Sequence, residues 1–215
     1  MAEKIWNMFG GGWAYYRPFG EAVIDGFDLN LEYGSGAGYE QFAWRLRQLM
    51  DGDQAKTGKE WILTAAPQCP HPDSHIDNSI KGTAFDAIFV QFYNNPACQA
   101  NTWALGKEQT SGKSFNFGQW HNFATTTARN KKMKVFLTLP LAGEIGTGYV
   151  SRTVAAKIIG DLKRYSSFGG FAGWDASIAE QNTGYTAAMK NALGPTKVTK
   201  RASGTKQFHN HHNRH

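Results

Sequence analysis

The sequence lacks any continuous apolar run long enough to cross a lipid bilayer, so no membrane-spanning helix and no membrane partner are expected. It carries no Asn-x-Ser/Thr sequon, and it opens on an amphipathic segment that does not resemble the apolar core of a secretory signal. Only two of the 215 residues are cysteine, Cys69 and Cys98, and no paired histidines accompany them, which argues against a zinc site. From the residues alone, the two cysteines remain either free thiols or a disulfide.

Excess positive charge is also lacking from most of the chain. The net charge is +6, but residues 196–215 hold five basic residues and no acid, so the rest of the chain is close to neutral. A nearly neutral body is atypical of a nucleic-acid-binding surface, and no nucleic acid is expected as a partner. We expect residues 1–195 to form one folded domain and 196–215 to form a disordered, basic, histidine-rich tail. Histidines in such a tail are more typical of a solvated segment than of a metal site, and no metal or organic cofactor is expected.

Short apolar runs alternate with segments of helical spacing along the chain, and glycine and aromatic residues are frequent. The predicted strands are 22–32, 61–66, 87–93, 134–140 and 170–174. The predicted helical segments are 3–9, 39–50, 73–80, 117–130, 151–165 and 184–193. This alternation indicates an α/β fold with a parallel sheet of βα units. Polar clusters follow the strands at their carboxyl ends, where active sites of (β/α)8 barrels lie.

The first predicted strand carries the most informative pattern, Asp-x-x-Asp-x-Asn-x-Glu over residues 25–32. Because side chains alternate between the two faces of a strand, Asp28, Asn30 and Glu32 are predicted to share one face. Such a row of polar groups is costly to bury unless it is paired or used in chemistry. The alternative is a half-exposed antiparallel strand that is solvated on its polar face, and the parallel βα pattern disfavours it.

This run resembles the catalytic strand of glycoside hydrolase family 18, whose pattern is Asp-x-x-Asp-x-Asp-x-Glu. Four later segments resemble strands five to eight of the class III chitinases of fungi and plants, in the same order: residues 64–70, 85–99, 136–140 and 173–177. The resemblance implies a (β/α)8 TIM barrel family, here an N-terminally truncated, partial barrel with about five parallel strands, family strands 4–8. We expect either a fragment of a longer protein or a chain that a complementing N-terminal half completes.

The resemblance also implies a chitinase that cleaves β-1,4-linked N-acetylglucosamine polymers internally and uses the substrate's own acetamide as the nucleophile. Glu32 would be the proton donor, and Asp28 would lie deeper on the same face and tune its neighbours. Asn30 stands where the family has Asp. An amide can accept a hydrogen bond from the acetamide N–H but cannot ionise, so activity is expected to be lower by roughly tenfold to ten-thousandfold.

Four further residues match substrate-binding positions of the family. Tyr93 would donate its hydroxyl to the acetamide oxygen, and Trp174 would form an apolar floor under the sugar that is attacked. Gln91 and Asn94 would contact the sugar. The alternative function is a chitinase-like lectin that binds chitooligosaccharide without cutting it, which Asn30 favours and an intact Glu32 opposes.

The family's cysteines at the positions of Cys69 and Cys98 form a disulfide, so the resemblance implies the same pair here. A disulfide is typical of an oxidising compartment. The resemblance therefore implies a secreted protein.

Overall fold

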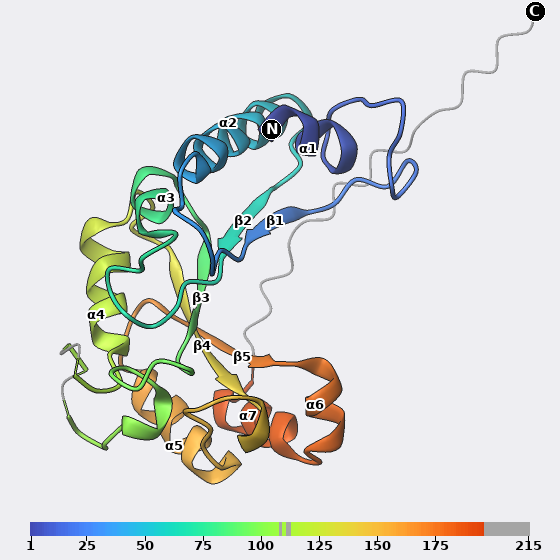
Figure 1. Ribbon diagram of the computed structural model, residues 1–215. Helices are drawn as coiled ribbons and strands as arrows, with labels where there is room; N and C mark the ends of the chain where they lie inside the picture. Colours follow the sequence, from blue (N-terminus) through green and yellow to red (C-terminus); the bar gives the residue numbers. More distant parts are fainter. Residues whose placement is uncertain (108, 111–112, 196–215) are drawn as a thin grey trace, which may run out of the picture.

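A computed structural model describes residues 1–107, 109–110 and 113–195 (Figure 1). The predicted tail at 196–215 lies outside these residues. Five strands form one sheet in the order β1-β2-β3-β4-β5, and every neighbouring pair is parallel. The strands are β1 (Gly26–Leu29), β2 (Ile62–Ala65), β3 (Ala87–Gln91), β4 (Lys134–Pro140) and β5 (Phe168–Trp174). The predicted α/β class and the five parallel strands are confirmed.

Helices connect the strands and lie on the convex side of the curved sheet, while its concave side is open (Figure 1). The α-helices are α1 (Ala2–Phe9), α2 (Tyr39–Thr57), α3 (Asp77–Gly82), α4 (Phe117–Asn122), α5 (Arg152–Leu162), α6 (Ala176–Gln181) and α7 (Tyr185–Leu193). A π-helical turn, Phe123–Thr127, continues α4, and two short 3-10 turns cover Ala100–Thr102 and Gly143–Ile145. The arrangement is that of an arc of a (β/α)8 barrel.

The first predicted strand, 22–32, is too long, because β1 ends at Leu29. The pairing of β1 with β2 ends with the hydrogen bond from the Ala66 amide to the Leu29 carbonyl, 3.0 Å long. The next amide in line to donate toward β1 is that of Gln68, and it donates to the Asp73 carboxylate at 2.8 Å instead, so the ladder does not continue. Asn30 and Glu32 therefore follow the strand instead of lying within it.

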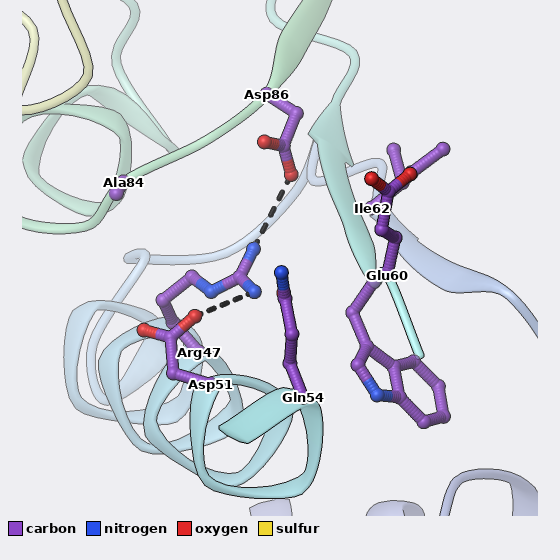
Figure 2. Close-up of a pocket in the computed structure, with 8 residues that line it drawn as sticks. Arg47, Asp51, Gln54, Glu60, Ile62, Ala84 and Asp86 are labelled. Carbon is purple, nitrogen blue, oxygen red and sulfur yellow. Dashed lines mark hydrogen bonds and ion pairs between the residues drawn. The ribbon is translucent and has the colours of Figure 1, made fainter. Parts of the chain in front are cut away.

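The amino-terminal ends of the strands are tied to α2 by Arg47. Its guanidinium pairs with Asp51, at 2.7 Å, and with Asp86, just before β3, at 3.3 Å (Figure 2). Asp86 also accepts a hydrogen bond from the Leu63 amide of β2, at 2.8 Å. Arg47, Asp51 and Asp86 line a cavity of about 500 Å³. One carboxylate thus joins a helix and two strands at the end of the sheet away from Glu32.

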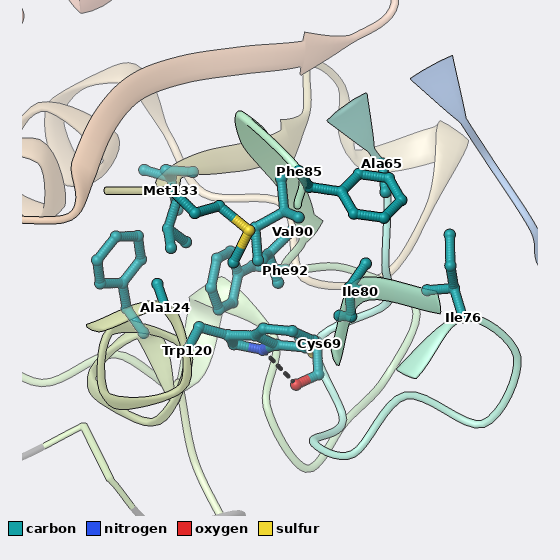
Figure 3. Close-up of a cluster of buried hydrophobic side chains, with 14 of the residues drawn as sticks. Ala65, Cys69, Ile76, Ile80, Phe85, Val90, Phe92, Trp120, Ala124 and Met133 are labelled. Carbon is teal, nitrogen blue, oxygen red and sulfur yellow. Dashed lines mark hydrogen bonds between the residues drawn. The ribbon is translucent and has the colours of Figure 1, made fainter. Parts of the chain in front are cut away.

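The hydrophobic core lies between the convex face of the sheet and the helices. Val90 and Phe92, from β3 and just after it, pack against Trp120 of α4, and all three are fully buried (Figure 3). The Trp120 indole N–H donates to the Cys69 carbonyl oxygen, 3.0 Å away. Burying each large apolar side chain contributes about 1.5–3 kcal/mol, so this layer holds the strands in register.

The predicted disulfide is confirmed. Cys69 and Cys98 are bonded through their sulfur atoms, their Cα atoms are 5.8 Å apart, and both residues are buried. The bond joins the loop that follows β2 to the loop that follows β3. It therefore fixes the two loops at the edge of the sheet where the polar clusters lie.

We expect the double variant Cys69→Ser/Cys98→Ser to lose about 3.5 kcal/mol of unfolding free energy, because the 29-residue separation no longer restricts the unfolded chain. Urea denaturation followed by circular dichroism measures this loss. Reductant should destabilise the unaltered protein and leave the double variant unchanged. Equal stability of the two proteins without reductant would contradict the expectation.

Candidate active site

Glu32 and Gln91 meet at the carboxyl end of the sheet. Gln91 is the last residue of β3, and its side-chain amide donates to Glu32 Oε1 at 3.0 Å. The same nitrogen donates to the Ala66 carbonyl oxygen at 2.9 Å. Gln91 is buried and Glu32 is half-buried. The amide is anchored on the backbone after β2, so it holds the Glu32 carboxyl in one orientation.

Tyr93 lies beside this pair, two residues beyond Gln91 and half-buried. Burial, and to a smaller extent the nearby Glu32 carboxylate, raises the pKa of Tyr93 to about 12. Both causes disfavour the phenolate. The hydroxyl therefore stays protonated at neutral pH and can donate a hydrogen bond.

Asp28 is paired with a residue that sequence reasoning missed. The two residues are opposite each other in the ladder of β1 and β2, and the Thr64 hydroxyl donates to Asp28 Oδ1 at 2.6 Å. Asp28 lies within β1, before Asn30 and Glu32 along the chain, and its side chain is exposed. Asp28 and Thr64 lie on the same face of the sheet, because side chains alternate between the two faces along each strand. This alternation is the signal that could have indicated the pair.

Asn30 follows β1 and is exposed. Its side chain makes no hydrogen bond with the part of the chain that the structure describes. Both ends of the amide, the carbonyl oxygen and the NH₂ group, are therefore available to a ligand.

Asn94 has a structural task that the sequence does not reveal. Its backbone is in the left-handed region, with φ at 57°. Its side-chain oxygen accepts a hydrogen bond from the Thr147 backbone N–H at 2.9 Å. Its backbone N–H donates to the Thr147 carbonyl oxygen at 3.0 Å. These bonds fasten the loop between β4 and α5 to the end of β3. Its predicted contact with a sugar stays a prediction.

Trp174 ends β5, opposite Pro140 of β4, and its side chain is 52% exposed. Its carbonyl oxygen accepts from the Leu141 amide at 3.0 Å. The next residue, Asp175, caps α6 by accepting from the amides of Ser177 and Ile178. Because β1 and β5 are the two edges of the sheet, Trp174 and Glu32 come from opposite ends of the arc, while Glu32, Gln91 and Tyr93 lie together.

The loop after Glu32 is tied to the loop after β2. A ring nitrogen of His75, Nδ1, lies 2.9 Å from the Gly34 carbonyl oxygen. Asp73 shapes the second loop by accepting from the amides of Gln68 and His75, each at 2.8 Å. These contacts limit the movement of the segment that carries Glu32, and no motif in the sequence announces them.

Within the described residues, no group of three or more His, Cys, Asp or Glu side chains has the arrangement of a metal site. The helices in the same part of the chain also fall short of the length and apolar composition needed to cross a membrane.

Comparison with known proteins decides the family. The model of the glycosyl hydrolases family 18 matches residues 1–149. Chitinase 2 of Rhizopus oligosporus is 42% identical over 190 residues, which cover 87% of this chain and 32% of that protein. The chain belongs to glycosyl hydrolase family 18. A second relative, the class III chitinase of Arthroderma benhamiae, is 40% identical over 198 residues, covering 89% of this chain and 58% of that protein.

Solved structures of similar proteins agree with the partial barrel. The ICChI chitinase of Ipomoea carnea has a TM-score of 0.70 at 27% identity, covering 89% of this chain and 65% of that chain. The xylanase and alpha-amylase inhibitor protein XAIP-II of Scadoxus multiflorus has a TM-score of 0.67 at 30% identity, covering 87% of this chain and 64% of that chain. The chain spans about a third to three fifths of the length of the two curated relatives above.

Proposed function

We propose that this family 18 chain is a chitinase that hydrolyses β-1,4-linked N-acetylglucosamine polymers internally, with retention of configuration and with Glu32 as the proton donor. The observation that carries the proposal is the hydrogen bond from Gln91 to Glu32, which orients a carboxyl group beside Tyr93 at the carboxyl end of the sheet. The chitinases among its relatives support the substrate class.

In the first step, the Glu32 carboxylic acid gives its proton to the glycosidic oxygen. The substrate's acetamide oxygen bonds to the anomeric carbon as the bond to the leaving sugar breaks, and a cyclic oxazolinium ion forms. The Tyr93 hydroxyl donates a hydrogen bond to the acetamide oxygen. In the second step, a water molecule gives a proton to the Glu32 carboxylate. The oxygen of that water attacks the anomeric carbon, and the oxazolinium ring opens.

Three other side chains have supporting roles in this proposal. The Asn30 amide oxygen accepts from the acetamide N–H, and the amide stays neutral. Asp28, held by Thr64, places a negative charge on the same side of the sheet, where it favours the cationic intermediate. The Trp174 indole lies under the apolar face of the sugar.

The product's configuration tests this proposal. Proton NMR during digestion of chitotetraose should show the β-anomer of the new reducing end first. Cellotetraose, which lacks the acetamide, should not be cleaved. Initial appearance of the α-anomer, or equal cleavage of both substrates, would contradict acetamide participation.

We expect Tyr93→Phe to lower the kcat for chitotriose hydrolysis by about 100-fold, the usual effect of losing one donor to a developing charge, with a smaller change in KM. Tyr39→Phe, on α2, is the matched control and should keep full activity. Because the folded state raises the pKa of Tyr93 from 10 to about 12, its contribution to stability is present below pH 10 and is lost as the pH rises toward 12. Unfolding free energies of the protein and of Tyr93→Phe, measured across this range, should therefore differ less at the alkaline end.

A second candidate function is a lectin that binds chitooligosaccharide and does not cut it. Asn30 favours this reading, because it lacks the charge that the family's Asp would supply to the intermediate. Calorimetric binding of chitotriose with no product after prolonged incubation would support the lectin. Release of shorter sugars would exclude it.

The confirmed disulfide supports the proposal that the protein is secreted, since such bonds persist in oxidising compartments. Immunoblots of culture medium and cell extract test it, and exclusive retention in the cytosol would contradict it.

We further propose that a complementing N-terminal polypeptide pairs with the open edges of β1 and β5 and covers the concave face. Co-expression with the corresponding N-terminal segment of the Rhizopus oligosporus relative should raise activity and yield a stable complex. If the two chains do not co-purify, this proposal is wrong.

A further inference from the structure

The loop between α1 and β1, residues 10–25, displays four large aromatic side chains to solvent; we call it the aromatic loop. The exposed fractions are 78% for Trp13, 98% for Tyr15, 69% for Tyr16 and 61% for Phe19. The loop projects from the body beside α1 (Figure 1). It leads into β1, so it lies at the opposite end of that strand from Glu32. Aromatic surface gathered in this way is typical of a binding site.

A single side chain fixes the shape of the aromatic loop. All five N–H donors of the Arg17 guanidinium bond to backbone carbonyl oxygens. The acceptors are Asn7 at 2.7 Å, Gly12 at 2.9 Å, Gly10 at 3.0 Å, and Gly20 and Ala22 at 3.1 Å. The loop is therefore ordered before any ligand arrives. A preorganised surface loses less conformational entropy on binding than a flexible one.

A cavity of about 610 Å³ lies between this loop and α1. Its lining comes from both elements: Lys4, Asn7, Met8, Trp13, Ala14 and Tyr16. The volume is in the range of small-molecule sites. Aromatic faces suit the apolar C–H face of a pyranose, while the Asn7 amide and the Lys4 ammonium can bond to hydroxyl and acetamide oxygens.

The charge of the lining restricts the ligand. Among the described residues, Lys4 is the one charged residue that lines the cavity, and none of the lining residues is a carboxylate. A sugar that carries an ammonium group, such as glucosamine, would be repelled by Lys4, whereas neutral N-acetylglucosamine would not. The cavity is therefore complementary to an acetylated polysaccharide and not to its deacetylated form.

We propose that the aromatic loop is a second polysaccharide site, separate from the catalytic one, that holds insoluble N-acetylglucosamine polymer. The choice of polymer rests on the function proposed above. The two sites lie at opposite ends of β1, so they contact different stretches of a polymer surface or different chains within it. The loop raises the concentration of the enzyme at an insoluble substrate, and it contributes nothing to the hydrolysis of a short soluble one.

The test uses the full chain with Glu32→Gln, so that retention is measured without cutting. We expect Trp13→Ala/Tyr16→Ala to lower the affinity for chitin beads at least tenfold. Trp44→Ala is the matched control: this tryptophan is on α2, is 48% exposed and lies outside the loop. It should leave binding unchanged. Arg17→Gln keeps every aromatic ring but removes the clamp, and it should weaken binding severalfold.

Near-UV circular dichroism of each variant checks that the fold is intact, and Tyr15→Ala gives a second variant at a side chain too exposed to affect folding. When Glu32 is retained, the unaltered chain and the Trp13→Ala/Tyr16→Ala variant should cleave soluble chitotriose at the same rate. Chitin retention that is unchanged in the double variant would overturn the proposal. Equal binding of chitosan and chitin would also overturn it. A double variant whose main change is the loss of self-association would overturn it too, because a second copy of the chain would then cover the loop. Absence of hydrolysis in the unaltered chain would refute the proposed function and leave this retention measurable.

Discussion

Replacing Glu32 with Gln is expected to lower the kcat for hydrolysis of a fluorogenic chitotriose by about 100-fold to 10,000-fold, the scale of losing a general acid–base catalyst. Gln has the shape of Glu, and its carbonyl oxygen can still accept from the Gln91 amide, which now bonds Glu32 Oε1 at 3.0 Å. The site should keep its geometry and lose only the proton that it supplies to the leaving sugar.

Binding separates this chemical effect from a structural one. Calorimetry should give chitotriose dissociation constants for the protein and for Glu32→Gln that agree within a few-fold. Glu180→Gln, at an exposed position of α6, is the matched control and should keep the full rate. A Glu32→Gln variant as fast as the unaltered protein would exclude Glu32 as the proton donor.

Asn30→Asp is expected to raise kcat by roughly tenfold to ten-thousandfold. The exposed Asn30 amide can orient the acetamide, but it cannot place a negative charge beside the oxazolinium ion. A carboxylate can do both. The side chain makes no hydrogen bond within the described part of the chain, so the exchange disturbs no existing contact.

Two further variants give this result its meaning. Asn191→Asp, at an exposed position of α7, adds the same charge away from the site and should change nothing. Asn30→Ala removes the hydrogen-bond acceptor and should lower activity below that of the unaltered protein. If Asn30→Asp shows no gain and Asn30→Ala no loss, this position takes no part in catalysis and the lectin gains support.

The sequence was sufficient to predict the order and the parallel pairing of the strands. Short apolar runs indicated the strands, and the helical segments between them indicated parallel neighbours. The family resemblance assigned Gln91 and Tyr93 to the sugar, but it did not predict the hydrogen bond from Gln91 to Glu32. The disulfide between Cys69 and Cys98 followed from the family resemblance, and the structure confirms it.

The remaining features depend on contacts between residues distant in sequence. At the early end of β1, the Gln68 amide after β2 donates to Asp73 and not to the segment after β1, which propensity within 22–32 cannot reveal. The Thr64–Asp28 hydrogen bond depends on the register of β1 and β2. The hydrogen bond between Asn94 and Thr147 depends on the left-handed backbone conformation of Asn94. Asp28 is exposed because, among the described residues, nothing covers the concave face. A barrel pattern in the sequence does not specify the exposure of Asp28.

The central claim is that this five-stranded arc assembles a working hydrolytic site around Glu32. The most direct test is the release of the fluorophore from chitotriose by the unaltered chain, purified with its disulfide intact and with its fold checked by near-UV circular dichroism. We predict slow but measurable turnover that saturates with substrate. Folded protein that binds chitotriose and releases no fluorophore would contradict the claim and assign the chain to the lectin function.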